Sequence, residues 1–195
     1  MAWRPAVTFD EVNALLSPRG PIISVMDDEE RRVLWRVAES TPGPVIEVGC
    51  QYGGTTILLA LATRSPVYVV DNWACGQRDD WIANCCMAGV NANTFEVAGD
   101  SVDKADSFPD AATALVLVDG DHTGEKPYLD LMAYAPKVAL GGFLFVDDVG
   151  WGHPDALAGV ARFENAIPST SFIRVFHHKQ VTGESKLLGY RRVEW

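Results

Sequence analysis

Five acidic residues stand at or just inside the ends of short apolar segments, where strands of a parallel sheet would finish: Glu47, Asp71, Asp119, Asp147 and Asp148. In such sheets ligands bind beyond the carboxyl ends of the strands. Carboxylates crowded there repel each other unless a cation lies between them. Oxygen-only ligands suit a hard ion such as Mg²⁺, which binds a few carboxylates and keeps positions for other oxygens. Three or four carboxylates, those of Asp119, Asp147 and Asp148 with Asp121, therefore predict a divalent metal at these strand ends, with helix capping without a metal as the alternative.

The segment from Glu47 to Thr55, EVGCQYGGT, places glycines where a strand turns into a helix. Glycines there let the backbone approach a ligand closely. A dinucleotide fingerprint would require glycine in place of Gln51, and a phosphate loop would require lysine in place of Thr55, so the segment fits neither. Asp71 follows 18 residues after Gly53, a distance suited to a carboxylate that accepts both hydroxyls of a ribose. These residues indicate a ligand with a ribose but no pyrophosphate.

Alternating helical and strand-like segments surround these positions. Apolar spacing predicts helices at 8–16, 28–38, 55–62, 79–88, 128–138 and 156–166, and short apolar runs predict strands at 45–48, 67–70, 94–98, 114–118, 143–146, 172–177 and 186–193. Such alternation favours a three-layer α/β fold with a mostly parallel, seven-stranded sheet covered on both faces. A turn at 182–184 joins the last two strands into a terminal antiparallel hairpin. Gly141-Gly142 predicts a further turn, before strand 143–146.

Length and composition favour one domain, 1–195, with an N-terminal helical layer over 1–40 and a cofactor-binding core over 45–195. The net charge of −10 leaves no basic field for nucleic acid, and it fits a small neutral or cationic ligand. No apolar run approaches the roughly 18 residues of a membrane span, and the first residues carry no secretory signal. We therefore expect a cytoplasmic protein with neither a membrane nor a nucleic-acid partner. Its cysteines lack Cys-x-x-Cys spacing, so a zinc site is not indicated.

The glycine segment resembles the first motif of class I S-adenosylmethionine-dependent methyltransferases, acid-x-Gly-x-x-x-Gly, through Glu47, Gly49 and Gly53. The resemblance implies a Rossmann-like methyltransferase fold and S-adenosylmethionine as cofactor. It further implies that Glu47 lies by the cofactor's amino group, Thr55 by its carboxylate and Asp71 on its ribose.

The resemblance extends to the segment after the third predicted strand. It implies that Asp100 and Ser101 lie near the adenine, although Ser101 suits the N-cap of a helix equally well. Asp119 is expected to contact the cofactor as well as the metal. A serine hydrolase is a distant alternative, because Gly99-Asp100-Ser101-Val102-Asp103 comes within one residue of a nucleophile elbow. The missing final glycine counts against it.

The acidic cluster is similar to that of metal-dependent small-molecule O-methyltransferases, of the catechol type and of the antibiotic-sugar and aminocoumarin-tailoring type. This resemblance runs from about residue 45 to 160 and implies Asp119, Asp147 and Asp148 as Mg²⁺ ligands. A bound ion lowers the pKa of a substrate hydroxyl and orients it toward the methyl sulfonium. The catechol type has a lysine base where this chain has His122. Relatives that share Asp-Gly-Asp make Asp121 the first candidate base, and His122, with an ordinary pKa of about 6.5, is the second.

We therefore expect Mg²⁺-assisted methyl transfer to a hydroxyl of a small molecule, such as a phenol, a catechol or a natural-product sugar. A metal-independent small-molecule methyltransferase and a non-catalytic cofactor-binding protein of the same fold are the alternatives. The sequence has little extra chain to form a lid over the acceptor. The acceptor pocket is thus either open or completed by a second subunit in a homodimer.

Overall fold

The computed structural model describes residues 7–18, 20–150, 152–179 and 185–194, and its centre is a seven-stranded sheet. The strands are β1 (Val45–Val48), β2 (Val67–Asp71), β3 (Thr94–Ala98), β4 (Thr113–Val118), β5 (Val138–Val146), β6 (Phe172–Lys179) and β7 (Ser185–Arg192). Their order is β3-β2-β1-β4-β5-β7-β6. The first five in this order pair in parallel, and β7 lies antiparallel between β5 and β6. The predicted sheet, with its terminal antiparallel pair, is confirmed.

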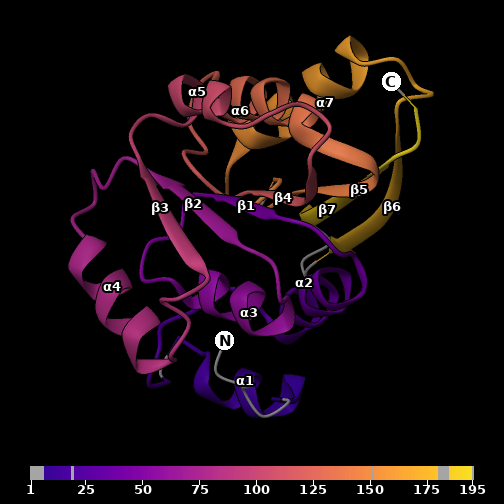
Figure 1. The fold of residues 1–195 in the computed structure, drawn as a ribbon. Coiled ribbons are helices and arrows are strands. Elements are labelled where there is room, and N and C mark those ends of the chain that lie inside the picture. Colours follow the sequence, from indigo (N-terminus) through magenta and orange to yellow (C-terminus); the bar gives the residue numbers. More distant parts are fainter. Residues whose placement is uncertain (1–6, 19, 151, 180–184, 195) are drawn as a thin grey trace.

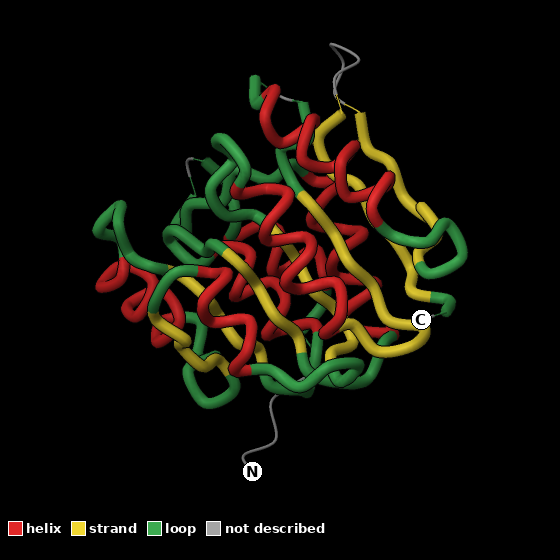
Figure 2. Tube along the Cα trace, turned by 90° about the horizontal axis from the view of Figure 1, so that it is seen from above, coloured by secondary structure: helices red, strands yellow, loops and turns green. Residues whose placement is uncertain are grey.

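Helices cover both faces of the sheet and make three layers (Figure 1). One face carries α5 (Ser101–Lys104), α6 (Lys126–Tyr134) and α7 (Pro154–Ala166); the other carries α2 (Asp28–Ser40), α3 (Gly54–Ala62) and α4 (Arg78–Met87), with α1 (Phe9–Leu15) outside them. Short 3-10 turns, η1 (Ala105–Ser107) and η2 (Ala135–Lys137), follow α5 and α6. Figure 2 shows from above how helices cross the strands, with the β6–β7 pair at one edge of the sheet.

Two hydrophobic cores hold the layers together, one on each face of the sheet. Leu115 and Leu117 of β4 belong to the core beneath α2 and α3, whereas Val116 and Val118 belong to the core beneath α6 and α7. Every residue of β1 and β4 is buried, which explains why these central strands are continuous apolar runs in the sequence. Burial on both faces fixes the ends of these strands, and those ends carry the candidate functional residues.

The helices α2 and α3 begin in different ways. Asp27 caps α2 by accepting from the amides of Glu29 and Glu30, and the Glu30 side chain accepts from the Asp27 amide in return. By contrast, α3 starts at Gly53, whose left-handed backbone (φ 83°) offers no capping side chain. The first amides of α3 are therefore available to donate to another acceptor. The positive end of the helix dipole favours an anionic group as that acceptor.

Two predicted boundaries near β5 are wrong. The helix predicted at 128–138 ends at Tyr134, and the turn predicted at Gly141-Gly142 lies inside β5, where the pairing with β4 changes register. A Cβ atom on Gly142 would lie 2.9 Å from the carbonyl oxygen of Ala114. These glycines therefore permit an irregular strand pairing instead of ending the strand. The sequence interpretation missed η1, and it considered α5 only as a helix capped by Ser101.

The predicted turn at 182–184 and residues 1–6 of the predicted N-terminal layer lie outside the described residues. Within the part of the chain that the structure describes, no helix has both the length and the apolar character needed to cross a membrane. Four free cysteines are described there; Cys50 and Cys85 are buried, and Cys75 and Cys86 are exposed.

Candidate functional site

The glycine turn after β1 brings the backbone of two strand ends into contact. Gly49 has φ 79°, and a Cβ atom on it would lie 2.7 Å from the Cα of Gly120 and closer still to the Asp119 carbonyl oxygen. Gly53 has no room for a side chain either, since its Cβ would lie 2.7 Å from the ring of Trp81. Glycine is therefore required at both motif positions, at Gly49 for a close backbone approach and at Gly53 for a helix start packed on an indole.

Glu47 is fully buried at the end of β1. Its Oε2 accepts a hydrogen bond from the Thr56 hydroxyl, which also accepts one from the Trp81 indole at 3.3 Å. Its Oε1 has no hydrogen-bond partner among the described residues. Burial, opposed by the Thr56 hydrogen bond and reinforced by the nearby Asp119 and Asp71 carboxylates, raises the pKa of Glu47 to about 8. A buried carboxyl with one unpartnered oxygen is suited to a cationic or hydrogen-bond-donating ligand group.

Glu47 should make stability depend on pH. Because its folded pKa of about 8 exceeds the ordinary value of 4.5, the folded state retains a proton that the unfolded chain releases between these values. Its contribution to the unfolding free energy is thus complete below pH 4.5 and is lost as pH rises through about 8, by up to about 5 kcal/mol. Glu47→Gln should flatten this loss in urea unfolding between pH 5 and 8.5. The exposed-site control Glu39→Gln should keep it, and equal slopes in wild type and Glu47→Gln would contradict the assignment.

Asp71, at the end of β2, supports the glycine turn. Its Oδ2 accepts from the Cys50 amide at 3.0 Å and its Oδ1 from the Trp73 amide at 2.7 Å. Oδ2 also accepts from the Cys50 thiol at 3.6 Å, so the second lone pair of Oδ1 remains as acceptor capacity for a ligand hydroxyl. Gln51 and Trp73, on either side of this carboxylate, both have left-handed backbone, with φ 45° and 58°. Such conformations are costly for non-glycine residues and often occur at functional sites.

A cavity of about 220 Å³ opens beyond the ends of β1, β4 and β5. Its lining includes four of the predicted cofactor residues, namely Glu47, Gly49, Thr55 and Asp119. The other lining residues are Ile23, Ser24, Val25, Cys50, Gln51, Tyr52, Gly54, Gly120, His122, Asp148 and His153. The wall formed by residues 23–25, before α2, was not predicted, because that segment carries no periodic or motif signal. It packs on the start of α3, where a Cβ on Gly54 would lie 2.6 Å from the Ile23 carbonyl oxygen.

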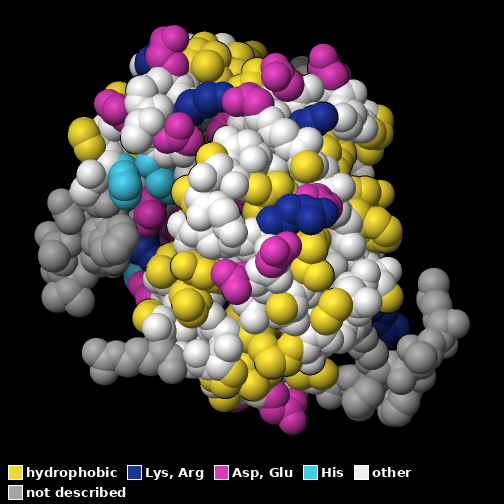
Figure 3. Space-filling model, turned by 90° about the vertical axis from the view of Figure 1, so that its left-hand side faces the viewer, with side chains coloured by type: hydrophobic (Ala, Val, Ile, Leu, Met, Phe, Trp, Pro, Cys, Tyr) yellow, Lys and Arg dark blue, Asp and Glu magenta, His cyan; other side chains and the backbone are white. Residues whose placement is uncertain are grey.

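Acidic and imidazole groups converge at one side of this cavity. Ligand atoms of Asp119, His122 and Asp148 all lie within 4.8 Å of one another. The Nε2 of His122 lies 3.5 Å from Asp119 Oδ1 and 3.7 Å from Asp148 Oδ2, and the His153 ring packs 4.8 Å from the His122 ring. Burial alone lowers the pKa of His122, but the surrounding carboxylates raise it above its ordinary value. Figure 3 shows histidine side chains next to acidic ones on one face of the molecule.

Asp147, the third predicted metal ligand, lies deeper than the other two. It is almost fully buried, its Oδ1 has no hydrogen-bond partner within the described chain, and it does not line the cavity. Burial and the charges of Asp119 and Glu30 raise its pKa well above the ordinary range, although the Lys186 ammonium opposes this. Lys186 is itself buried and donates to Glu30 at 2.6 Å. The raised pKa favours the neutral form of Asp147, which lies apart from the residues that line the cavity.

Asp121, the first candidate base, is exposed and turned toward its own loop. Its Oδ1 accepts from the amide of Thr123 at 2.9 Å and from the hydroxyl at 2.7 Å, and these bonds lower the pKa of Asp121. It does not line the cavity, whereas His122 does. Of the two candidate bases, the structure thus brings only His122 to the cavity.

Asp100 and Ser101, predicted near the adenine, follow β3 and lie outside the cavity lining. The expected N-cap role belongs to Asp100, which accepts from the Val102 amide at 3.1 Å. The Ser101 hydroxyl instead donates to Asp130 Oδ1 at 2.5 Å. A nucleophilic role for Ser101 is not supported, because its hydroxyl bonds a buried carboxylate and has no described histidine as a partner.

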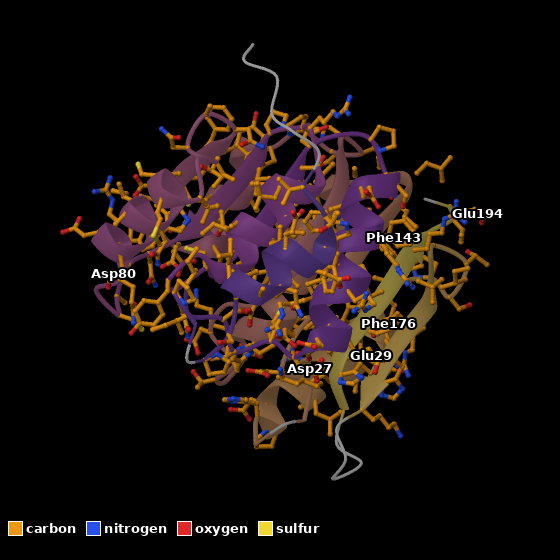
Figure 4. The ribbon with its side chains drawn as sticks, turned by 90° about the horizontal axis from the view of Figure 1, so that it is seen from below. Asp27, Glu29, Asp80, Phe143, Phe176 and Glu194 are labelled. Atoms are coloured by element: carbon orange, nitrogen blue, oxygen red, sulfur yellow. The ribbon has the colours of Figure 1, made fainter. Side chains whose placement is uncertain are left out.

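Two other features belong to different parts of the fold. His178 lies 2.7 Å from Asp27 and 3.3 Å from Glu29, a set of ion pairs between β6 and the start of α2. Figure 4 shows both acids beside the hairpin ribbon and far from Asp80 of α4. An apolar cavity of about 240 Å³ lies among α6, α7 and β6, and its described lining residues include no titratable side chain. It offers no group for chemistry.

Comparisons with known proteins agree with this geometry. Residues 46–149, more than half of the chain, match a family described as a methyltransferase domain. A search of curated proteins found no similar sequence. Similar solved structures include the O-methyltransferase TomG from Streptomyces achromogenes, involved in tomaymycin synthesis and in complex with SAM (18% identity, TM-score 0.73, covering 87% of this chain and 82% of that chain).

Two further structures share the fold. One is the O-methyltransferase from Bacillus cereus in complex with SAH (16% identity, TM-score 0.69, 86% and 82% covered). The other is an rRNA methylase from Streptococcus thermophilus (12% identity, TM-score 0.67, 88% and 100% covered). At these identities the likeness shows the fold alone. Because the family match spans β1 to the end of β5, and thus the glycine turn and the acidic strand ends, the chain belongs to this methyltransferase family.

Proposed function

We propose that this protein transfers a methyl group from S-adenosylmethionine to a hydroxyl of a small molecule, with a divalent ion at the acceptor. The observation that carries the proposal is the cavity at the strand ends, whose lining includes Glu47, with an Oε1 that no described residue bonds, and the start of α3, which has no capping side chain. A carboxyl oxygen that accepts from an ammonium, beside amide donors for a carboxylate, matches the two ends of an amino acid. The methionine part of the cofactor carries both groups.

The rest of the cofactor extends along the strand ends in this proposal. Asp71 accepts from a ribose hydroxyl with the lone pair of Oδ1 that the Trp73 amide leaves, and the adenine lies over the Asp100-Ser101 turn. The 220 Å³ cavity then holds the methionine part and the methyl group. The transferred methyl would then lie next to Asp119, His122 and Asp148, where the acceptor would approach.

The residues around Asp119 fit a hard divalent ion such as Mg²⁺. Asp119 and Asp148 would hold it together with the imidazole of His122, and the carboxyl of Asp147 lies deeper, outside the cavity lining. Such an ion would supply Lewis acidity to the acceptor hydroxyl. Burial, reinforced by the neighbouring carboxylates, raises the pKa values of Asp119 and Asp147, and the charges of His122 and Lys186 do not balance this cost as a divalent cation would. This mismatch is the argument for a metal-assisted transfer over a metal-independent one.

A histidine that binds the ion cannot also accept the proton. If the carboxylates alone hold the ion, His122 is the proposed proton acceptor, because its ring lines the cavity and Asp121 does not. The His153 ring, tilted by 42° against it, and the carboxylates of Asp119 and Asp148 hold its orientation. A small acceptor is favoured over rRNA because the chain carries a net charge of −10, which repels phosphates. The cavity mouth also presents the exposed side chains of Ile23 and Val25, which suit an apolar ring.

Cofactor binding is tested by thermal unfolding with S-adenosylhomocysteine and with S-adenosylmethionine. At a hundred times the dissociation constant, binding should stabilise the wild type by about 2.7 kcal/mol and raise the melting temperature. Asp71→Asn should lose most of this shift, because an amide has a single acceptor oxygen for two backbone amides and a ribose. Asp80→Ala, at an exposed acid of α4, is the matched control and should keep it. Absence of any shift in the wild type would refute the proposed function.

A further inference from the structure

The helix α6 presents a row of polar side chains to the turn that follows β3. Lys126, Asp130 and Tyr134 stand four residues apart, so they share one face of the helix. Between them they bind two consecutive residues, Asp100 through Lys126 and Ser101 through Asp130 and Tyr134. Lys126 Nζ donates to Asp100 Oδ2 at 2.5 Å, Asp130 accepts from the Ser101 hydroxyl at 2.5 Å, and the Tyr134 hydroxyl donates to the Ser101 carbonyl at 2.8 Å.

This row of contacts, the α6 clamp, is costly to build at its centre. Asp130 is 1% exposed, and burial raises its pKa to about 6, so it is ionised at neutral pH inside the protein. Lys126 is the cation that opposes this burial cost. Tyr134 is fully buried as well. A surface turn of two residues needs no buried carboxylate to hold it, since Asp100 already caps α5 with its own side chain.

The same helix also borders the turn after β4, which carries Asp119. The second oxygen of Asp130 lies 3.5 Å from the point where a Cβ on Gly120 would stand. The loop from β4 to α6 is fixed further at Gly124, whose amide donates to Asp155 of α7 at 2.8 Å. The helix α6 thus bonds the turn after β3 and directly follows the loop that carries Asp119 and His122.

We infer that Lys126, Asp130 and Tyr134 are positioning residues that fix the Asp100-Ser101 turn for the adenine end of the cofactor. This inference rests on the proposed function, which places the adenine over that turn. The clamp holds the turn in register with the strand ends, so that the adenine and the methyl group are bound at a fixed separation. Freeing the turn would add an ordering cost to every binding event, and the affinity for the cofactor would fall.

Titration calorimetry with S-adenosylhomocysteine tests the clamp. Tyr134→Phe and Asp130→Ala should each weaken binding roughly five- to tenfold, because each frees one bond to Ser101. Asp130→Asn keeps an oxygen that can accept from Ser101 and should restore affinity to within about twofold of wild type. Tyr128→Phe is the matched control, since Tyr128 is on α6 but packs against Arg162 instead, and it should bind as wild type does.

The outcomes separate the two proposals. If the wild type fails to bind S-adenosylhomocysteine, the proposed function fails. If the wild type binds but Tyr134→Phe and Asp130→Ala bind within twofold of it, the clamp inference is wrong and the function stands. A general loosening of the fold would weaken Asp130→Asn as much as Asp130→Ala, so failure of the asparagine variant to restore binding also overturns the clamp. Should Asp130→Ala not fold, Tyr134→Phe and Lys126→Met give the same comparison.

Discussion

Gly49→Ala should reduce the affinity for S-adenosylhomocysteine by about a hundredfold, equivalent to about 2.8 kcal/mol of binding free energy. The added methyl would lie 2.7 Å from the Cα of Gly120 and even closer to the Asp119 carbonyl oxygen. Both obstacles are backbone, so no side chain can rotate away. The turn after β1 or the turn after β4 must shift. Both turns line the cavity, and the second contains Asp119. We expect the unfolding free energy to fall by more than about 3 kcal/mol as well.

The chain offers a matched control for this substitution. Gly76 has nearly the same backbone, φ 81° against 79° at Gly49, but no described atom lies within 4 Å of its Cβ position. Gly76→Ala therefore carries the left-handed strain, about 1 kcal/mol, without the collision. It should bind S-adenosylhomocysteine as the wild type does. Similar losses of affinity in both variants would show that backbone strain alone, and not contact between the two turns, explains the need for glycine at position 49.

Asp148→Asn should abolish the proposed metal site while leaving cofactor binding intact. Asp148 has a left-handed backbone, φ 53°, which asparagine tolerates, so the loop can keep its shape. Losing one carboxylate ligand should weaken Mn²⁺ binding, followed by electron paramagnetic resonance, by roughly a hundredfold or more. Methyl transfer to an accepted substrate should fall about a thousandfold, equivalent to about 4 kcal/mol of transition-state stabilisation.

Asp121→Asn is the control for this second prediction. Asp121 is also an aspartate and lies two residues after Asp119 in the chain, but its side chain is exposed and accepts hydrogen bonds from Thr123. Mn²⁺ binding should therefore be unchanged in Asp121→Asn. Loss of transfer with retained metal would instead make Asp121 the base, in place of His122. Methyl transfer that persists in Asp148→Asn and in the presence of a chelator would contradict metal assistance altogether.

The positions of the strand ends could be read from the sequence because they depend on local signals. A fully buried strand is a run of apolar residues, and its end is marked by the first polar residue or glycine. The apolar runs alone therefore assign Glu47, Asp71 and Asp119 to one edge of the sheet, and the structure has them at the ends of β1, β2 and β4. The helix end at Tyr134 was misjudged because Val138 fits a helical pattern and a strand equally well.

The composition of the cavity could not be read in the same way. Whether His122 or Asp147 joins Asp119 and Asp148 depends on the path of the loop after β4, where a hydrogen-bonded turn directs Asp121 outward and His122 inward. Residues 23–25 line the cavity, and α6 reaches the Ser101 turn, through packing between segments far apart in the chain.

Sequence periodicity thus determined the class of fold and the strand ends that carry acids, and the glycine motif indicated the cofactor. These signals are properties of residues that are neighbours in the chain. Only the tertiary structure decided which side chains share the cavity at the turn after Glu47, and which helix holds the turn after β3. Those choices depend on strand order and loop direction, which contacts between distant segments fix and which no local pattern encodes.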